Sequence, residues 1–151
     1  SKGWSYGVGG SVAPRIGRMP YVVSAPVQAD QTGPSIAALR DDFTAFLTTD
    51  GIKEAEQSRV VAARTLSLAG DFETGDAVLG AMQTIERYGR PDNYYETLAA
   101  TYSGFDRAAL DAGIRREIDP KRFTWVVVGD AKVVRPQLDA LGLPVEVVVA
   151  K

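Results

Sequence analysis

Apolar and small residues alternate along the beginning of the chain. Residues 4–12 place Trp4, Tyr6 and Val8 on one side of an extended chain, with serine and glycine on the other side. A period of two is typical of a strand with one packed face. A second apolar run over residues 21–27 follows a turn that contains proline and glycine. The two runs therefore predict an antiparallel hairpin.

The middle of the chain has the three-to-four-residue apolar spacing of amphipathic helices. This spacing predicts five helices, over residues 34–48, 53–69, 75–88, 93–102 and 107–118. Gly51, Gly70 and Gly89 follow the first three of them, and glycine ends a helix at low cost because it adopts the left-handed conformation. Pro120 follows the fifth helix and cannot continue it.

The tail of the chain has a different pattern. A nearly continuous apolar run over residues 123–128 predicts a buried strand. A helix over residues 132–141 and a last strand over residues 145–149 are predicted after it, and the pairing of these strands is left open. The order of hairpin, helices and strand–helix–strand predicts a single α+β domain over residues 1–151, with an antiparallel or mixed sheet packed against several helices.

Two residue types are missing altogether, since the chain has no histidine and no cysteine. It therefore lacks the imidazole base of a serine triad, the usual zinc ligands and a thiolate nucleophile. The net charge of −2 gives no basic footprint for nucleic acid. No apolar run approaches the roughly 20 residues that span a bilayer. We expect no catalytic residue and no metal site in this chain, and neither nucleic acid nor a membrane as a partner.

The opening segment Lys2-Gly3-Trp4-Ser5-Tyr6-Gly7 resembles the K-G-x-x-Y-G segment of the insulinase-type or pitrilysin-type zinc metallopeptidases, peptidase family M16. Further features resemble that family and occur in the right order. They are the hairpin, the helix that follows it, the I-K-E-A-E start of the next helix, the D-P-K-R-F-T-W-V-V-V-G-D strand and the closing L-G-L-P-V-E-V segment. The resemblance covers nearly the whole chain. No single motif is highly specific, but the occurrence of all these features in the family's order is.

The resemblance implies a non-catalytic domain. M16 peptidases pair homologous domains, of which one carries an inverted H-x-x-E-H zinc motif and the other closes the opposite side of a substrate chamber. K-G-x-x-Y-G is more typical of the second kind, and the match begins part-way into such a domain. The chain also starts without methionine, so we expect a partial C-terminal-type domain from a longer protein. Glu54, Glu56 and Glu73 do not match the family's third zinc ligand.

The resemblance also supplies the expected partners. Zinc is expected in the catalytic M16 domain of the parent protein, in the same chain or in a partner subunit, and none is expected here. Peptide is the expected substrate. The sequence does not determine the compartment. Related bacterial enzymes are often exported, so the resemblance weakly favours the periplasm.

Tyr6 is the candidate substrate-binding residue. In the family pattern this tyrosine contacts the substrate together with an arginine, whose position falls before Ser1. A tyrosine hydroxyl can donate to a developing oxyanion, and Gly7 and Gly9 leave room for an extended peptide to pair with the strand. The alternative for Tyr6 is an aromatic side chain in the core, which is also the expectation for Trp4.

Other interpretations lead to other classes of protein. A structural homologue without proteolysis, as in the core subunits of respiratory complexes, is one alternative, and an independent α+β binding module is another. Tyr94, Tyr95 and Tyr102 are expected at a helix–helix contact, with a stacking platform for carbohydrate or peptide as the alternative. Asp41 and Asp42 diverge on a helix surface, which argues against a catalytic carboxylate pair.

Overall fold

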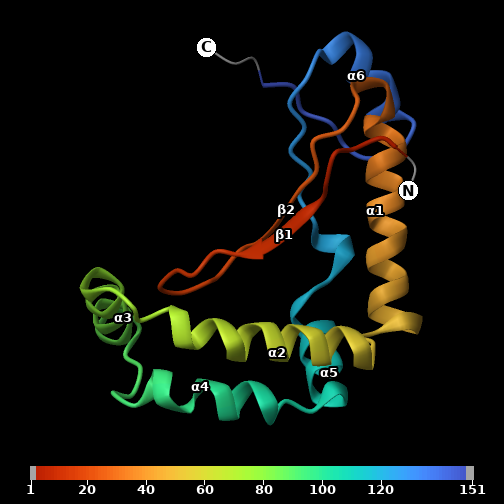
Figure 1. Cartoon of the computed structure of the whole chain (residues 1–151). Helices are drawn as coiled ribbons and strands as arrows, with labels where there is room; N and C mark the ends of the chain where they lie inside the picture. Colours follow the sequence, from red (N-terminus) through yellow and green to blue (C-terminus); the bar gives the residue numbers. More distant parts are fainter. Residues whose placement is uncertain (1–2, 149–151) are drawn as a thin grey trace. The chain divides into compact units, whose positions relative to one another are not determined.

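The computed structural model describes residues 3–148, which form two compact units (Figure 1). The discontinuous unit consists of the described parts of residues 1–45 and 120–151, and the helical unit consists of residues 46–119. None of the helices in the described part of the chain combines the length and apolar character needed to cross a membrane.

The discontinuous unit begins with the predicted hairpin. Strands β1 (Gly9–Val12) and β2 (Tyr21–Ser24) are antiparallel, and Val12 lies opposite Tyr21 in their register. An isolated antiparallel bridge joins Ser5, before β1, to Val27, after β2. The strands are shorter than predicted, and the sheet has two strands among the described residues.

Helices α1 (Thr32–Ala45) and α6 (Ala131–Asp139) pack together in the discontinuous unit. Ile36 of α1 and Val134 of α6 are its most deeply buried apolar side chains, at 6% and 5% exposure. Helix α1 was predicted to start at residue 34 and to run to residue 48. It instead starts two residues earlier and is followed by a π-helical turn, η2 (Phe46–Asp50), in the helical unit.

A line of aromatic rings connects the hairpin to the rest of the discontinuous unit. Tyr21 of β2 meets Phe43 of α1 edge to face, with ring centroids 6.1 Å apart. Phe43 meets Phe123 at 5.1 Å, and Phe123 meets Trp125 at 6.0 Å, again with nearly perpendicular rings. This is the preferred geometry of aromatic pairs, so the hairpin, α1 and the C-terminal segment share one apolar cluster.

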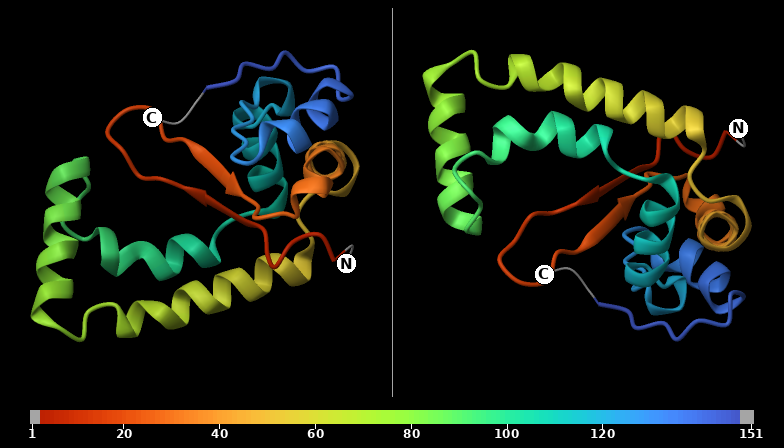
Figure 2. Two further views of the ribbon diagram at one scale, coloured as in Figure 1. Left: turned by 90° about the horizontal axis from the view of Figure 1, so that it is seen from above. Right: turned by 90° about the horizontal axis from the view of Figure 1, so that it is seen from below.

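The helical unit contains α2 (Glu54–Gly70), α3 (Gly75–Tyr88), α4 (Tyr94–Ser103) and α5 (Arg107–Glu117). Their bounds agree with the predicted helices to within one residue. Helices α2 and α4 run side by side (Figure 2), and Leu98 of α4 is the buried apolar residue of this unit, at 8% exposure.

Two of these helices start where their sequence provides an N-cap. The side chain of Thr74 accepts a hydrogen bond from the Ala77 amide at 3.2 Å, and the Asp106 carboxylate accepts one from the Ala109 amide at 2.8 Å. Such caps satisfy amides that have no partner within the helix. Helix α3 ends at Gly89 with a φ of 58°, as the sequence predicts.

The predicted strands over residues 123–128 and 145–149 are not formed in the described chain, so that prediction was wrong for these residues, with Val149 lying outside them. Residues 124–128 and 143–148 belong to no helix or strand, and no strand pairs with them among the described residues. A strand persists only when its backbone amides and carbonyls meet a partner, and β1 and β2 pair with each other. The fold is therefore rich in helix with a small two-stranded sheet, rather than an extended sheet packed against helices.

Candidate functional site

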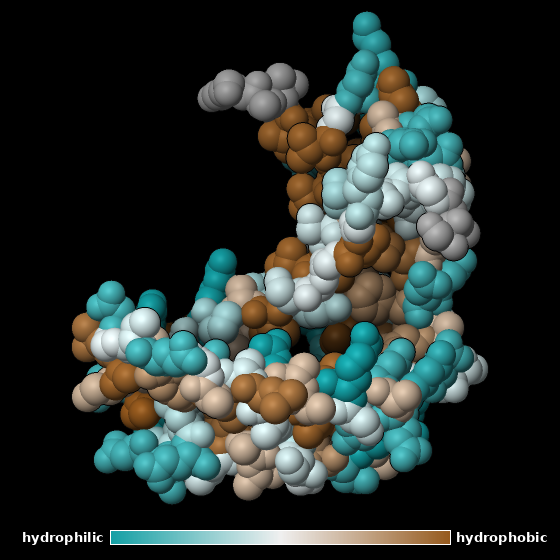
Figure 3. Space-filling model, viewed as in Figure 1, coloured by the Kyte–Doolittle hydropathy of each residue, from teal (hydrophilic) through white to brown (hydrophobic). Residues whose placement is uncertain are grey.

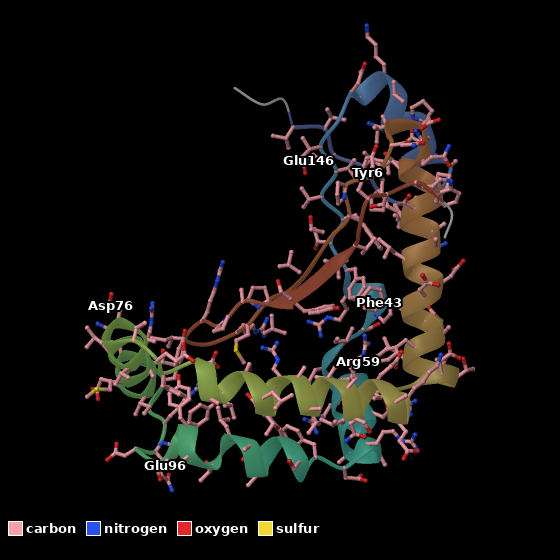
Figure 4. All side chains as sticks on the ribbon, in the orientation of Figure 1. Tyr6, Phe43, Arg59, Asp76, Glu96 and Glu146 are labelled. Atoms are coloured by element: carbon pink, nitrogen blue, oxygen red, sulfur yellow. The ribbon has the colours of Figure 1, made fainter. Side chains whose placement is uncertain are left out.

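Tyr6 lies in the segment that leads into β1, and its side chain is fully exposed (Figure 4). Val8, two residues further on, is also exposed, at 56%. The prediction that Trp4, Tyr6 and Val8 share a packed face was therefore wrong for Tyr6 and Val8. The alternative placement of Tyr6 in the core is likewise contradicted within the described chain, whereas Trp4 is half-buried.

Local hydrogen bonds of Ser5 explain why the alternation fails here. The Ser5 hydroxyl accepts a bond from the Gly7 amide at 3.1 Å and lies 2.8 Å from the Gly7 carbonyl and 2.6 Å from the Pro26 carbonyl, to which it can donate. A serine side chain that bonds to nearby backbone groups competes with a strand ladder. The chain bends at Trp4 and at Tyr6, on either side of Ser5, and the Tyr6 side chain lies outward.

The bend is held against the second arm of the hairpin. The Gln28 amide donates to the Trp4 carbonyl at 3.0 Å, next to the bridge between Ser5 and Val27. An ideal Cβ on Gly7 or Gly9 would meet no atom within 4 Å, so space is open beside Tyr6 as the sequence predicts. Gly10 differs, because a Cβ there would lie 2.5 Å from the Tyr21 hydroxyl oxygen.

A cavity of about 280 Å³ lies between this segment and α1. Trp4, Val8 and Val27 supply apolar walls from the hairpin side, and Leu39 and Asp42 line it from α1. Ser35 also lines the cavity, and its Oγ is buried without a hydrogen-bond partner among the described residues. The cavity suits an apolar side chain, and one carboxylate stands in its wall.

The other aromatic candidate residues have structural partners in the helical unit. The Tyr95 ring meets Phe72 with centroids 5.1 Å apart, and the Arg90 guanidinium lies 4.2 Å from the Tyr94 ring centroid. The ring centroids of Tyr102 and Phe105 lie 6.4 Å apart.

Asp41 and Asp42 lie on the surface of α1 in the discontinuous unit. Over residues 3–148, no three acidic side chains come together in a group that could hold a metal ion.

Two structural residues were missed by sequence reasoning. The Gln137 side chain accepts from the Gly33 amide at 3.0 Å and donates to the Ala29 carbonyl at 2.8 Å, which connects α6 to the start of α1. The Asp111 carboxylate accepts from the Ile52 amide at 2.9 Å. These partners are 104 and 59 residues apart in the sequence, and no local pattern identifies such pairs.

No protein-family model and no curated protein sequence matches this chain. A solved structure does match, the crystal structure of a peptidase M16 inactive domain from Pseudomonas fluorescens, with a TM-score of 0.65 and 19% sequence identity over 79% of this chain. The alignment covers 28% of that chain, so this chain spans little more than a quarter of the matched protein. The protein described here has an M16-like fold, similar to that of an inactive M16 domain.

Proposed function

We propose that this chain is a non-catalytic domain of an M16-type zinc metallopeptidase. It forms one wall of the substrate chamber and contacts the peptide, while hydrolysis takes place at the zinc of a catalytic partner domain. The similarity to an inactive M16 domain, at a TM-score of 0.65, is the observation that carries this proposal.

The surroundings of Tyr6 support the proposed substrate contact. Its hydroxyl is exposed and available to a ligand, and the positions of Gly7 and Gly9 leave free space along the same backbone. An extended peptide can pair with such an edge by β-augmentation. The tyrosine hydroxyl can then donate to the carbonyl oxygen on which negative charge develops during hydrolysis.

The proposal is tested by Tyr6→Phe in the assembled peptidase, which contains this chain and the catalytic partner domain. The substitution removes only the hydroxyl. If that hydroxyl stabilises the transition state, kcat falls about tenfold to a hundredfold while KM changes little. Zinc content, measured by metal analysis of the same sample, stays at the wild-type value because Tyr6 holds no metal.

Tyr102→Phe is the matched control, since it removes a hydroxyl from the helical unit and should leave turnover unchanged. A wild-type kcat in the Tyr6→Phe enzyme would contradict the role of Tyr6. If no catalytic partner with zinc-dependent peptidase activity assembles with the chain, the chain is a structural homologue of the family and the proposed function fails.

A further inference from the structure

The cavity of about 280 Å³ beside α1 lies next to Tyr6, since both chain neighbours of that residue, Ser5 and Gly7, line it. Apolar residues gather on this part of the discontinuous unit, between the hairpin and α1 (Figure 3). Trp4 and Leu39 are half-buried in the cavity walls. A peptide that contacts Tyr6 therefore passes a cavity that can take one of its side chains.

One face of α1 forms a wall of this cavity. Ser35, Leu39 and Asp42 line it together and follow one another at intervals of four and three positions, as expected for residues on one face of a helix. Ser35 is 8% exposed, and its Oγ has no hydrogen-bond partner among the described residues. A buried hydroxyl without a partner is rare in a folded protein, so this wall suits a ligand that brings hydrogen-bond donors.

The cavity carries a negative charge. Asp42 is the only charged side chain among the described residues that line it, and neither ion pair of the described chain includes this carboxylate. Asp42 is exposed at the rim, where water still reaches an ion pair and the cost of desolvation is small. Trp4 adds to the preference for a cation, because tryptophan is the aromatic side chain that attracts cations most strongly.

We propose that this cavity binds the side chain of a lysine or arginine of the peptide, an inference that rests on the proposed function. The aliphatic stem lies against Val8, Val27 and Leu39, and the terminal cation pairs with Asp42. Basic side chains bind in this way because the stem covers apolar surface while the charged group stays near water. A neutral aliphatic side chain would gain nothing from the carboxylate, and an acidic one would be repelled by it.

The test uses the whole chain, labelled with nitrogen-15, and three capped heptapeptides of serine and alanine. The peptides differ at the central residue, which is lysine, glutamate or norleucine, whose straight stem is that of lysine without the ammonium group. The indole N–H signals of Trp4 and Trp125 are followed by NMR as peptide is added. Trp125 does not line this cavity and serves as the internal control.

We expect the Trp4 signal to shift as the lysine peptide is added, and the Trp125 signal to stay in place. The lysine peptide should bind about fivefold more tightly than the norleucine peptide, which is the upper range for an ion pair at an exposed carboxylate. The glutamate peptide should bind more weakly than either.

Three variants assign this preference to one carboxylate. Asp42→Asn should lower the affinity for the lysine peptide to that for the norleucine peptide. Asp41→Asn is the matched control, because Asp41 is exposed on α1 without lining the cavity, and it should change nothing. Asp42→Lys reverses the charge and should make the glutamate peptide the preferred ligand. Misfolding cannot produce this reversal, since a misfolded chain would lose affinity for every peptide.

Four results would overturn the proposal. They are equal affinities for the lysine and norleucine peptides, no shift of the Trp4 signal, and an effect of Asp41→Asn as large as that of Asp42→Asn. The fourth is dimerisation of the chain in sedimentation that Asp42→Asn abolishes. An arginine of a second copy would then fill the cavity, for example the exposed Arg15 or Arg18.

These outcomes can be told apart from failure of the proposed function, because peptide binding to the chain needs neither zinc nor a catalytic partner. Discrimination between the peptides, combined with a wild-type kcat in the Tyr6→Phe enzyme, would keep the pocket and contradict the role of Tyr6. Equal affinities, combined with loss of turnover in the Tyr6→Phe enzyme, would keep the proposed function and contradict the pocket.

Discussion

Gly51 shows how one residue connects a helix end to a distant carboxylate. It follows the π-helical turn with a φ of 64°, a conformation that side-chain-bearing residues rarely adopt. An ideal Cβ on Gly51 would lie 2.8 Å from Asp111 Oδ2, and the other oxygen of that carboxylate accepts the Ile52 amide. The sequence indicates that a glycine ends this helix, but it does not indicate that the Asp111 carboxylate lies beside that glycine.

Gly51→Ala should destabilise the helical unit by about 2 kcal/mol or more. It forces alanine into the left-handed region and displaces a carboxylate that satisfies a partly buried amide. Urea unfolding followed by circular dichroism measures the change in the free energy of unfolding.

Gly80→Ala is the matched control for that experiment. Gly80 lies inside α3, where an ideal Cβ meets nothing within 4 Å, so alanine should raise stability by up to about 1 kcal/mol. Equal effects of the two substitutions would show that the contact with Asp111 does not restrict position 51.

At the scale of the elements, the start of α1 depends on α6. The first amides of a helix have no partner within it, and the Gly33 amide is satisfied by Gln137 rather than by a local cap. Gln137 also bonds to the Ala29 and Val133 carbonyls, at 2.8 and 2.9 Å. One glutamine thus positions α6, the short turn before α1 and α1 itself.

Gln137→Ala should lower the stability of the discontinuous unit by about 1–3 kcal/mol, because it leaves the partly buried Gly33 amide without its partner. Denaturant unfolding followed by Trp125 fluorescence, in a chain that also carries Trp4→Phe, reports on this unit. Gln83→Ala on the exposed side of α3 is the control and should change stability by less than about 0.5 kcal/mol. An equally small effect at Gln137 would mean that solvent replaces its bonds.

The two units share one property at the scale of the whole molecule, namely that few apolar side chains are fully enclosed. Among the described residues, the buried apolar ones are Ile36, Leu98 and Val134. A domain of about 150 residues ordinarily buries roughly two-thirds of the surface of its unfolded chain around a continuous core. Exposed apolar surface of this kind marks sites of protein contact, which is what the proposed packing against a catalytic partner domain requires.

The purified chain should contain no stoichiometric zinc and should not cleave peptides by itself. The chain has no histidine or cysteine, and its acidic residues form no metal-binding group within the described part. Metal analysis after dialysis against zinc, with a peptidase assay on the same sample, checks both expectations. One tightly bound zinc per chain would contradict the proposed division of labour between the domains.

The four helices of the helical unit could be predicted from the sequence to within one residue, whereas α1 begins two residues earlier than predicted and α6 ends two residues earlier. Their boundaries depend on local signals, such as the Thr74 and Asp106 caps and Gly89 at a C-terminus, which act within one turn of the chain. The hairpin could also be predicted, because its two strands are close in sequence. Tyr6 could be singled out as a candidate, although its fully exposed position could not.

Only the tertiary structure decided which extended segments find partners. Residues 123–128 have the composition of a buried strand, but pairing requires a neighbour that composition does not specify. Ser5, next to Tyr6, bonds across the hairpin to Pro26, and Gln137 satisfies a helix start 104 residues away. The sequence by itself therefore determined the elements with local causes, whereas long-range hydrogen bonds and burial decided the surroundings of Tyr6. They also left two strand-like segments without partners among the described residues.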